Sequence, residues 1–428
     1  MNSNEVFVSL DIGTSNVKVI IGEMANDTLN VIGVGNVNSH GLRKGSIVDI
    51  DETVHSIKKA IEQAERMVGI PIQSVVVGVS ANSVQLQDAH GVVAVSSENR
   101  EINDQDVARV IEAAQVVSIP PEREIIDVIP KQFIVDGLDE INDPRGMLGV
   151  RLEMEGTIVT GSKTILHNLL RCVERAGLEI TAICLQPLAA GSISLSRDEM
   201  EFGVALVDIG GGSTTIAFFE NGHLKATTVL PIGGDNITKD LSIGLRTSTD
   251  DAEKIKTKYG HAFYDTASEE ETFNVPIIGS DKEEQYNQLI ISDIIEARFE
   301  EMFDMIKNEV RQLGIRELPG GYVLTGGAVN ISGSLELAQQ ILANNVRVAI
   351  PDYIGVREPQ YTTGVGLIQF AYRNAKLQGK SIVEENRPID LAEKRVAKKP
   401  QQLKQKSKQK NEENLSEKVK KFFGLFWE

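Results

Sequence analysis

The sequence is poor in cysteine and in aromatic residues. Its 428 residues include two cysteines, one tryptophan and 5% aromatic residues in all. Cys172 and Cys184 lack the spacing of metal ligands, so we expect reduced core residues rather than a disulfide scaffold. A chain of this length can bury a large core, which we expect to be mainly aliphatic and divided between two lobes or several subdomains.

Long apolar runs and targeting signals are also missing. No run approaches the roughly 18 to 20 apolar residues that a membrane-spanning helix needs. The N-terminal sequence has no basic region leading into an apolar one, which predicts no signal peptide and a cytosolic body. The six histidines show no HxxxH spacing and no Gly-x-Ser-x-Gly occurs, so metalloprotease and esterase activities are unsupported.

The stretch GTIVTGSKT at 156–164 is close to a P-loop but departs from it at one position. Ser162 separates Gly161 from Lys163, whereas a P-loop requires lysine directly after the second glycine. We therefore predict that Lys163 is a solvated residue at the start of a helix over 164–176.

Positive charge is scarce outside one segment. The formal net charge is −17, yet residues 391–421 hold eleven basic and four acidic residues, so that segment carries +7 and the remainder −24. An acidic body argues against nucleic acid as the main partner.

Two related stretches are the strongest signal in the chain. VALVDIGGGSTTIAFF at 204–219 has a twin, VFVSLDIGTSNVKVI, at 6–20. Each reads as an apolar strand, Asp-Ile-Gly, hydroxyl residues and a second apolar strand, which is typical of a hairpin with a glycine-rich turn. Without Cβ atoms, such a turn lets backbone N–H groups approach a ligand closely.

The repeat continues beyond the turns. In the first half we predict three strands, a helix that Asp51 caps, and a further strand; in the second half, three strands and a helix that begins at Asp235. The predicted strands and first helix are 6–10, 17–21, 29–34, 51–68 and 74–79, then 204–207, 216–219 and 224–230. Such a duplication predicts two related α/β lobes that face each other across a cleft.

The residues at the turns suit a nucleotide. Asp11 and Asp208 end their strands facing the same cleft, and Lys18 adds a cation. Two carboxylates near a polyphosphate suit a hydrated magnesium ion. One turn alone is explained as well by a tight hairpin closed by an aspartate side chain, but two related turns, with Gly326 and Gly327 for an adenosine, favour a nucleotide site.

Five segments resemble the nucleotide motifs of the actin-like ATPases: 11–18, Gln186–Pro187, 208–214, the TGGA turn at 325–328 and Thr363–Gly364. PKQFIVDGLDEINDPRGMLGVRLEME at 130–155 and KYGHAFYD at 258–265 are similar to the FtsA family of bacterial cell division proteins. The resemblance covers about residues 5–375. It implies a duplicated, two-lobed actin-like fold of the α/β class with an inserted α+β subdomain.

The resemblance also implies a site for ATP and Mg²⁺. Asp11 and Asp208 would hold the metal through water, Gln186 would help to orient an attacking water, and Glu253 and Lys256 would flank the adenosine. The other implied ATP-binding residues are Gly13, Thr14, Ser15, Asn16, Lys18, Gly210, Gly211, Gly212, Ser213, Thr214, Gly234, Asp235, Gly326, Gly327 and Ala328. Members of the family hydrolyse ATP poorly, so we expect ATP chiefly as a ligand for conformation and polymerisation.

The expected domain boundaries follow from the repeat and the resemblance. The first lobe has its core at 1–83, completed by 162–200 and 355–380, with the inserted subdomain at 84–161. The second lobe has its core at 201–234, completed by 314–354, with a small subdomain at 235–313. Residues 381–413 are a predicted disordered linker.

The last segment, 414–428, recovers a helical pattern. Its apolar side chains form one stripe, with lysines opposite: Leu415, Val419, Phe422, Phe423 and Phe426, bordered by Leu425 and Trp427. A basic amphipathic helix with aromatic residues suits an anionic membrane surface. The alternative is a helix that docks on the protein itself or on a partner. The basic linker before it favours the membrane, and polymerisation would add avidity.

These features predict an ATP-binding scaffold that polymerises, tethers the tubulin-like protein FtsZ to the cytoplasmic membrane at the division site and recruits other division proteins. The anionic C-terminal peptide of FtsZ is expected to meet Arg298 on a long helix over 287–313, although a solvated surface role fits Arg298 equally. A small-metabolite kinase of the same architecture is the alternative, but no catalytic carboxylate for an acceptor hydroxyl is evident. A chaperone ATPase would need a peptide-binding β-domain where the linker lies.

Overall fold

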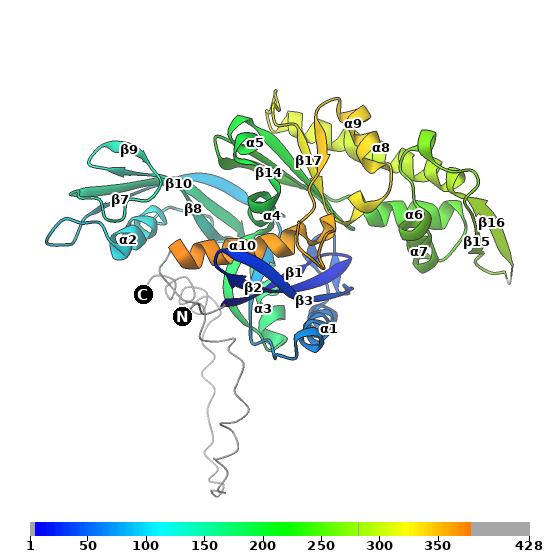
Figure 1. Ribbon diagram of the computed structural model, residues 1–428, viewed down its shortest axis with the longest axis horizontal. Coiled ribbons are helices and arrows are strands. Elements are labelled where there is room, and N and C mark those ends of the chain that lie inside the picture. Colours follow the sequence, from blue (N-terminus) through cyan, green and yellow to red (C-terminus); the bar gives the residue numbers. More distant parts are fainter. Residues whose placement is uncertain (1–4, 281, 378–428) are drawn as a thin grey trace, which may run out of the picture. The chain divides into compact units, whose positions relative to one another are not determined.

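The computed structural model describes residues 5–280 and 282–377, which divide into two compact units (Figure 1). The first unit holds residues 5–87, 119–129, 157–280 and 282–377, and the second holds 88–118 and 130–156. Both predicted lobes therefore belong to the first unit.

The first lobe is built on a five-stranded sheet of order β11-β6-β1-β2-β3. Its first three strands form an antiparallel meander, and β6 and β11 add to β1 in parallel. The strands are β1 (Glu5–Ile12), β2 (Asn16–Ala25), β3 (Thr28–Asn38), β6 (Ser74–Val79) and β11 (Glu179–Leu185). Two short strands, β4 (Leu42–Arg43) and β5 (Ser46–Ile47), pair beside this sheet's connection to α1 (Ile50–Val68).

The second lobe repeats this sheet. Its order is β14-β13-β12-β17-β18, again an antiparallel meander followed by two parallel strands. The strands are β12 (Val204–Ile209), β13 (Thr214–Glu220), β14 (His223–Leu230), β17 (Tyr322–Thr325) and β18 (Val346–Val348). The duplication that the two hairpin sequences predicted is thus confirmed.

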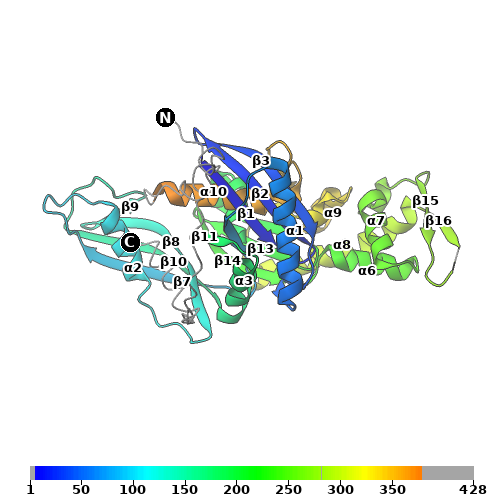
Figure 2. The same cartoon turned by 90° about the horizontal axis from the view of Figure 1, so that it is seen from below.

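Helices cover both faces of the first sheet (Figures 1 and 2). α1 and α3 (Lys163–Arg175) pack on one face, and α4 (Gln186–Ser194) and α10 (Thr362–Leu377) pack on the other. α4 and α10 touch so closely that a Cβ on Gly366 would lie 2.1 Å from the carbonyl oxygen of Ala189. This contact fixes where α4 presents its first residue, Gln186.

The predicted cap of α1 was wrong by two residues. Asp49 has extended backbone angles, and its carboxylate accepts from the N–H of Glu52 at 3.0 Å, as an N-cap does. Asp51 instead lies in the first helical turn, where it pairs with Arg175 at 2.6 Å and its charge favours the helix N-terminus. The helix ends as predicted at Gly69, which has φ 71°.

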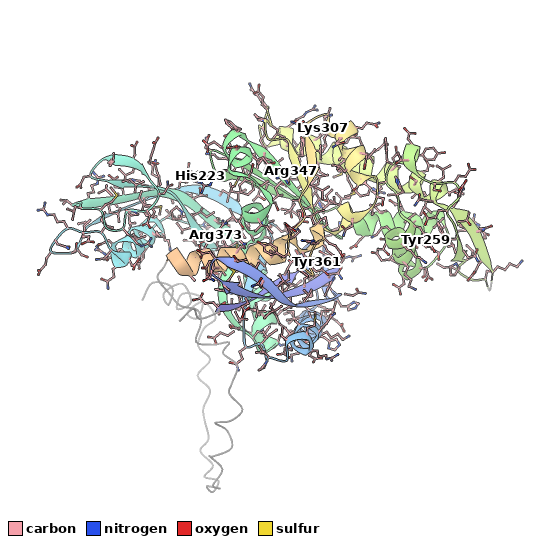
Figure 3. The ribbon with its side chains drawn as sticks, in the orientation of Figure 1. His223, Tyr259, Lys307, Arg347, Tyr361 and Arg373 are labelled. Atoms are coloured by element: carbon pink, nitrogen blue, oxygen red, sulfur yellow. The ribbon has the colours of Figure 1, made fainter. Side chains whose placement is uncertain are left out.

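A helical subdomain extends the second lobe between β14 and β17. Its long helix α8 buries Ile291, Ile295, Phe299 and Phe303 in one core with strands β12 and β13. Lys307 of α8 also donates to the carbonyl of Ile341 at 2.9 Å, which ties α8 to α9 (Figure 3). The elements of the subdomain are α6 (Gly234–Gly244), α7 (Thr249–Tyr259), η1 (Tyr264–Thr266), β15 (Thr272–Pro276), β16 (Glu283–Asn287) and α8 (Gln288–Gln312). Elsewhere in the first unit lie α5 (Arg197–Phe202), η2 (Gly327–Asn330), α9 (Ser334–Leu342) and η3 (Pro359–Tyr361).

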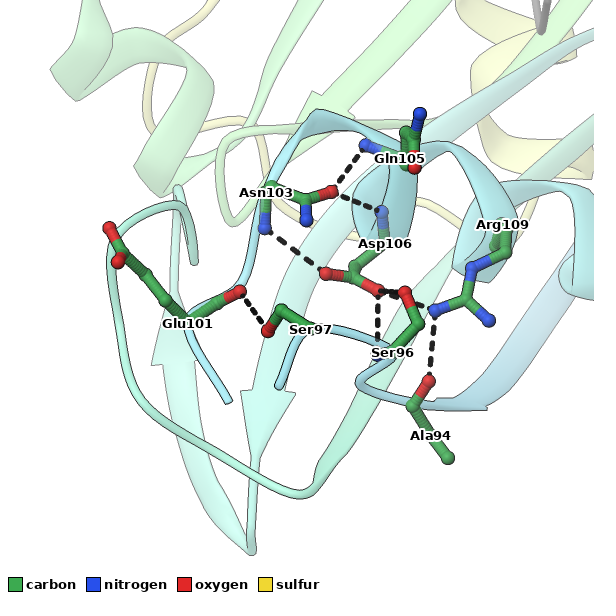
Figure 4. Close-up of polar contacts among 8 residues, drawn as sticks. All are labelled: Ala94, Ser96, Ser97, Glu101, Asn103, Gln105, Asp106 and Arg109. Atoms are coloured by element: carbon green, nitrogen blue, oxygen red, sulfur yellow. Dashed lines mark hydrogen bonds and ion pairs between the residues drawn. The ribbon is translucent and has the colours of Figure 1, made fainter. Parts of the chain in front are cut away.

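A sheet of order β7-β10-β8-β9 lies mainly in the second unit, together with α2, and ends of β7, β8 and β10 belong to the first unit. Asp106 in the first turn of α2 accepts from the N–H of Asn103 at 3.2 Å and from both donors of Ser96, and it pairs with Arg109 (Figure 4). Burial raises the pKa of Asp106, but these hydrogen bonds outweigh burial and hold the pKa below its usual range. The elements are β7 (Gln85–Ala94), α2 (Asp104–Ala114), β8 (Arg123–Val135), β9 (Leu138–Ile141) and β10 (Arg151–Ser162).

Candidate functional site

The central hairpin of each lobe closes with the same turn. Between β1 and β2, the N–H of Gly13 donates to the carbonyl of Asn16 at 3.0 Å. Between β12 and β13, the N–H of Gly210 donates to the carbonyl of Ser213, also at 3.0 Å. The two Asp-Ile-Gly sequences therefore fold alike and belong to corresponding places in the two lobes.

An aspartate stands at the same position of each hairpin. Strand register sets Asp11 opposite Lys18 in the first lobe and Asp208 opposite Thr215 in the second. Residues that face each other across an antiparallel pair project from the same face of the sheet. Each aspartate thus shares its face with a different partner, a cation in one lobe and a hydroxyl in the other.

The two turns meet at a single cavity and touch each other there. Ser15 Oγ donates to Asp235 Oδ1 at 2.9 Å. A Cβ on Gly211 would lie only 1.7 Å from Ser15 Oγ, and one on Gly212 would lie 2.5 Å from Thr14 Cγ2. The close approach of the opposite turn therefore favours glycine at both positions. A ligand that approaches their N–H groups would be a second reason for glycine there.

Asp11 is buried and held by two side chains. Gln186 Nε2 donates to Asp11 Oδ1 at 2.7 Å, and Lys18 Nζ lies 3.6 Å from Asp11 Oδ2. Gln186 reaches this position because it is the first residue of α4, immediately after β11 ends. The carboxylate of Asp11, near the end of β1, is thus held by side chains from the start of α4 and from β2.

The carboxylate of Asp208 has different surroundings from that of Asp11. Burial raises its pKa to about 6; Lys18 counters the rise, Asp11 adds to it, and a 3.3 Å hydrogen bond from Thr363 Oγ1 counters it. Gly326, with φ 95°, leaves room for the carboxylate, since a Cβ there would lie 2.3 Å from Asp208 Oδ1. Asp208 is therefore ionised only in part near pH 6.

The N-terminus of α6 packs beneath the glycine turn of the second lobe. The N–H of Gly234 donates to the carbonyl of Gly210, and the N–H of Asp235 to that of Gly211, both at 2.9 Å. The positive end of a helix dipole thus lies next to the cavity, an arrangement that favours anions.

A buried lysine stabilises this junction from behind. Lys256 Nζ donates to the carbonyl of Gly234 at 3.2 Å, to Thr238 Oγ1 at 2.7 Å and to Glu253 Oε2 at 2.6 Å. Its three donors are therefore satisfied within the second lobe.

Most of the predicted site residues line the cavity together. They are Asp11, Gly13, Thr14, Ser15, Asn16, Lys18, Gln186, Asp208, Gly210, Gly211, Gly212, Ser213, Gly326 and Gly327. Lys18 is the only basic residue among the lining residues in the described part of the chain. The predicted residues that do not line it are Thr214, Gly234, Asp235, Glu253, Lys256 and Ala328.

Thr215 lines the cavity in place of Thr214, which was the predicted ligand residue. The side chain of Thr214 is fully buried and donates to the carbonyl of Ile232 at 2.8 Å. Thr215, opposite Asp208, lines the cavity instead. Sequence reasoning also missed Gly45, Ser80 and Gln360, which lie on connections outside the repeated hairpins.

A side-chain network holds the first turn from the side. Asn16 Nδ2 donates to Asn36 Oδ1 at 3.0 Å, and Asn36 Nδ2 donates at 3.3 Å to the hydroxyl of Tyr361, whose position is labelled in Figure 3. Tyr361 belongs to η3, which directly precedes α10 and Thr363. The network therefore links the turn of the first lobe to the segment that contacts Asp208.

Arg298, the predicted partner contact, lies on α8 and holds a carboxylate of its own subdomain. Its Nε and Nη2 donate to the two oxygens of Asp240 at 2.6 and 3.0 Å, and its Nη1 pairs with Glu301. Hydrogen bonding to Asp240 is the main reason that the pKa of Arg298 is raised. The guanidinium thus links α6 to α8.

Two further predictions concern cysteine and the membrane. Cys172 and Cys184 are free and buried, and burial raises the pKa of both thiols. The residues of the predicted amphipathic helix, Leu415 to Trp427, lie outside the described residues. Within residues 5–280 and 282–377, no helix is both long and apolar enough to span a bilayer.

Comparisons with known proteins agree with this geometry. A family model described as "Cell division protein FtsA" matches residues 205–366, and one described as "SHS2 domain inserted in FTSA" matches residues 81–160. The chain is 62% identical over 443 residues to the cell division protein FtsA of Bacillus subtilis (strain 168), with all of both chains covered.

Solved structures share the fold at low sequence identity. A chain of the PilM-PilN type IV pilus biogenesis complex superposes with a TM-score of 0.58 at 17% identity, covering 86% of this chain and 98% of that one. MreB5 of Spiroplasma citri bound to ADP gives a TM-score of 0.54 at 14% identity, covering 88% and 99%. These likenesses confirm the predicted actin-like fold with its inserted subdomain.

Proposed function

The chain belongs to the FtsA family of cell division proteins, and from this premise we propose that it is an ATP-regulated scaffold of the division site. As an actin-like cell division protein, it combines a nucleotide cleft with surfaces for assembly. In the proposal, ATP sets the orientation of the lobes and promotes polymerisation. The domain boundaries proposed from the sequence apply to this scaffold.

The observation that carries the proposal is the single cavity formed by two equivalent turns. Glycines of both turns, several hydroxyls and Lys18 line it, and the N-terminus of α6 packs against the second turn. A lysine and hydroxyls beside glycine backbone suit a polyphosphate. Among the described residues no cluster of three or more potential ligands could hold a metal alone. Mg²⁺ usually keeps several waters and binds few carboxylates together with phosphate oxygens, which fits Asp11 and Asp208.

The residues present therefore fit Mg²⁺ with ATP. Asp11 and Asp208 would hold the metal through water, and the metal would neutralise phosphate charge. Gly326 and Gly327 would accept the adenosine, with Lys256 and Glu253 supporting that end from behind Gly234. Gln186, fixed by its hydrogen bond to Asp11, would help to orient a water in slow hydrolysis.

We assign membrane attachment to residues 414–428 and assembly to the body. The tail would bind anionic lipid at the cytoplasmic face of the division site, polymerisation would multiply its copies, and FtsZ together with other division proteins would bind the body. Lipid, FtsZ and a second copy of this chain are thus its proposed partners.

Titration with ATP, with and without Mg²⁺, tests the cleft. Asp208→Asn keeps the size of the side chain and removes its charge, so we expect ATP affinity in Mg²⁺ to fall about tenfold, while Mg²⁺-free binding changes little or improves. Asp139→Asn is the matched control because Asp139 is exposed on β9 in the second unit. Unchanged Mg²⁺-dependent affinity in Asp208→Asn would show that the cleft is assigned wrongly.

Co-sedimentation with anionic liposomes and FtsZ tests the scaffold. The full chain is expected to recruit FtsZ to liposomes more strongly with ATP, and a chain that ends at Lys410 should stay in the supernatant while still binding ATP. Liposome binding by the truncated chain would contradict the assignment of the tail.

Arg298→Glu tests the FtsZ contact. Because Arg298 already holds Asp240, the substitution also breaks an internal ion pair, so Asp240→Ala serves as the control that breaks the pair and keeps the arginine. FtsZ binding lost in Arg298→Glu and retained in Asp240→Ala supports the contact. Equal binding in both variants would remove Arg298 from the interface.

A further inference from the structure

An open groove runs between η1 and the first half of α8. Four carboxylates and two large apolar side chains are among its lining residues: Asp265, Asp293, Glu296, Glu300, Tyr264 and Ile290. The three carboxylates of α8 recur at spacings of three and four, so they share one side of the helix. Arg298 projects from the other side, and the groove is separate from the Arg298–Asp240 pair.

The groove is acidic, and most of its charge has no partner. Asp265, Asp293 and Glu300 have no ion pair within the described part of the chain, while Glu296 accepts a hydrogen bond from the N–H of Tyr264. No basic side chain is among the lining residues within 5–280 and 282–377. Such a surface repels an anionic peptide and attracts a cationic one.

The groove also exposes apolar surface. Ile290 is 47% exposed and Tyr264 is 43% exposed, although both are residue types that gain free energy on burial. Such a surface is complementary to a segment in which lysines adjoin aromatic residues, because the lysines can pair with the carboxylates while the aromatic rings cover the isoleucine and the tyrosine. Within this chain, residues 414–428 have that pattern: Lys418, Lys420 and Lys421 adjoin Phe422, Phe423 and Phe426.

We propose that the groove binds this chain's own C-terminal segment, 414–428, when no membrane is present. Phe422, Phe423 and Phe426 cover Ile290 and Tyr264, and the lysines approach Asp293 and Glu300. The same aromatic stripe cannot contact lipid and the groove at once, so the groove and the membrane compete for it. The competition with lipid rests on the proposed membrane function. Binding of the segment in the groove does not depend on that function.

The tail leaves from the compact unit that holds the groove. α10 ends at Leu377, in the same compact unit as α8, and 36 residues, 378–413, precede the segment. Thirty-six residues span at most about 120 Å when fully extended. Because the segment and the groove belong to one chain, their encounter is intramolecular, so a lower affinity is sufficient than for a separate peptide.

Cross-linking in the full chain tests the occupant. A short bis-maleimide should join Ile290→Cys to Phe423→Cys within one chain, because Cys172 and Cys184 are buried and react slowly. The control pairs Phe423→Cys with Glu62→Cys, an exposed acidic position on α1. We expect at least about a fivefold higher yield for the groove pair, as expected when one position is occupied and the other is met only by diffusion.

Three outcomes of that experiment would overturn the proposal. They are a groove yield equal to the control yield, a cross-link formed only between two chains, and a groove cysteine that reaches added FtsZ but never the tail. The last two would assign the groove to a second copy or to the partner. Loss of the intrachain cross-link on addition of phosphatidylglycerol vesicles supports competition with lipid. If the cross-link persists with vesicles, the groove assignment holds and the proposed membrane function fails.

Vesicle affinity provides a second measurement. Asp293→Lys with Glu300→Lys should release the tail and tighten binding to phosphatidylglycerol vesicles about three- to tenfold, since removing a competing state raises the binding-competent fraction. Asp250→Lys with Glu283→Lys makes the same charge change at exposed positions outside the groove. An equal gain in both variants would show that the effect is net charge alone, which contradicts the proposal.

Discussion

The central hairpins of the two lobes share a backbone conformation but differ in the charged and polar groups around their aspartates. Both turns close with the same 3.0 Å hydrogen bond, and both place an aspartate at the end of the first strand. Asp11 has Lys18 at 3.6 Å and an amide donor at 2.7 Å. Asp208 accepts a hydrogen bond from the hydroxyl of Thr363 at 3.3 Å, and burial raises its pKa to about 6.

This difference indicates how a duplicated scaffold acquires distinct roles. The first lobe supplies the cation, and the second supplies a carboxylate whose charge depends on its surroundings. A metal bound through water would favour the ionised form of Asp208, since an opposite charge nearby lowers the pKa of a carboxylate. The second lobe is therefore the side that we expect to respond to ligand and pH.

Loss of the cation should have the largest effect. Lys18→Met leaves two carboxylates facing a polyphosphate without a lysine, so we expect ATP affinity in Mg²⁺ to fall about 100-fold, or about 3 kcal/mol, in the range for a charged hydrogen-bond partner. Isothermal titration measures it. Lys225→Met, at an exposed position on β14, should bind as the parent does, and a loss below about threefold in Lys18→Met would contradict the assigned role.

The setting of Asp208 predicts a stability that depends on pH. Its folded pKa is about 6 against an ordinary 3.8, so ionisation disfavours the folded state increasingly from about pH 4 to pH 6 and fully above that range. Without nucleotide, Asp208→Asn should be more stable at pH 7.5 by about 2 to 3 kcal/mol, and equally stable near pH 4. Urea denaturation measures the difference, and a gain that stays constant with pH would contradict the raised pKa.

The backbone plan of the site could be predicted from the sequence because it is local. Strand, aspartate, glycine and hydroxyl residues recur in both halves within about fifteen positions, and hairpin formation depends mainly on such neighbours. The fold class followed from the same repeat and from the family resemblance. The different roles of Thr214 and Thr215 could also have been predicted, because strand alternation places only Thr215 on the face of Asp208. The prediction treated the motif as one unit and did not apply this alternation.

Contacts between distant segments could not be predicted in the same way. The hydrogen bond from Ser15 to Asp235 joins residues 220 positions apart, and it depends on how the lobes pack. Gly45, Ser80 and Gln360 reach the cavity from connections without a repeated pattern. The two glycines at 211 and 212 were interpreted only as room for a ligand, whereas their clearance is set by Ser15 and Thr14.

Substitutions at Gly211 and Ser15 test how closely the two turns approach each other. Gly211→Ala places a Cβ 1.7 Å from Ser15 Oγ and 2.7 Å from Asp235 Oδ1, so we expect a loss of about 1 to 3 kcal/mol in the free energy of unfolding. Adding Ser15→Gly should recover at least half of it, because the main obstacle is removed. A double-mutant cycle in urea measures the coupling, and additive losses would show that the two turns do not touch in solution.

Substitutions of Thr214 and Thr215 should have the smallest effects, one on stability and the other on ATP binding. Thr214→Ala removes a buried hydroxyl and leaves the carbonyl of Ile232 without that donor, which should cost about 1 to 2 kcal/mol of stability and leave ATP affinity unchanged. Thr215→Ala, at the cavity, should lower ATP affinity about threefold to tenfold with little loss of stability. Urea denaturation and ATP titration on both variants give the comparison. If Thr214→Ala weakened binding more than Thr215→Ala did, the strand register would not determine which residue meets the nucleotide.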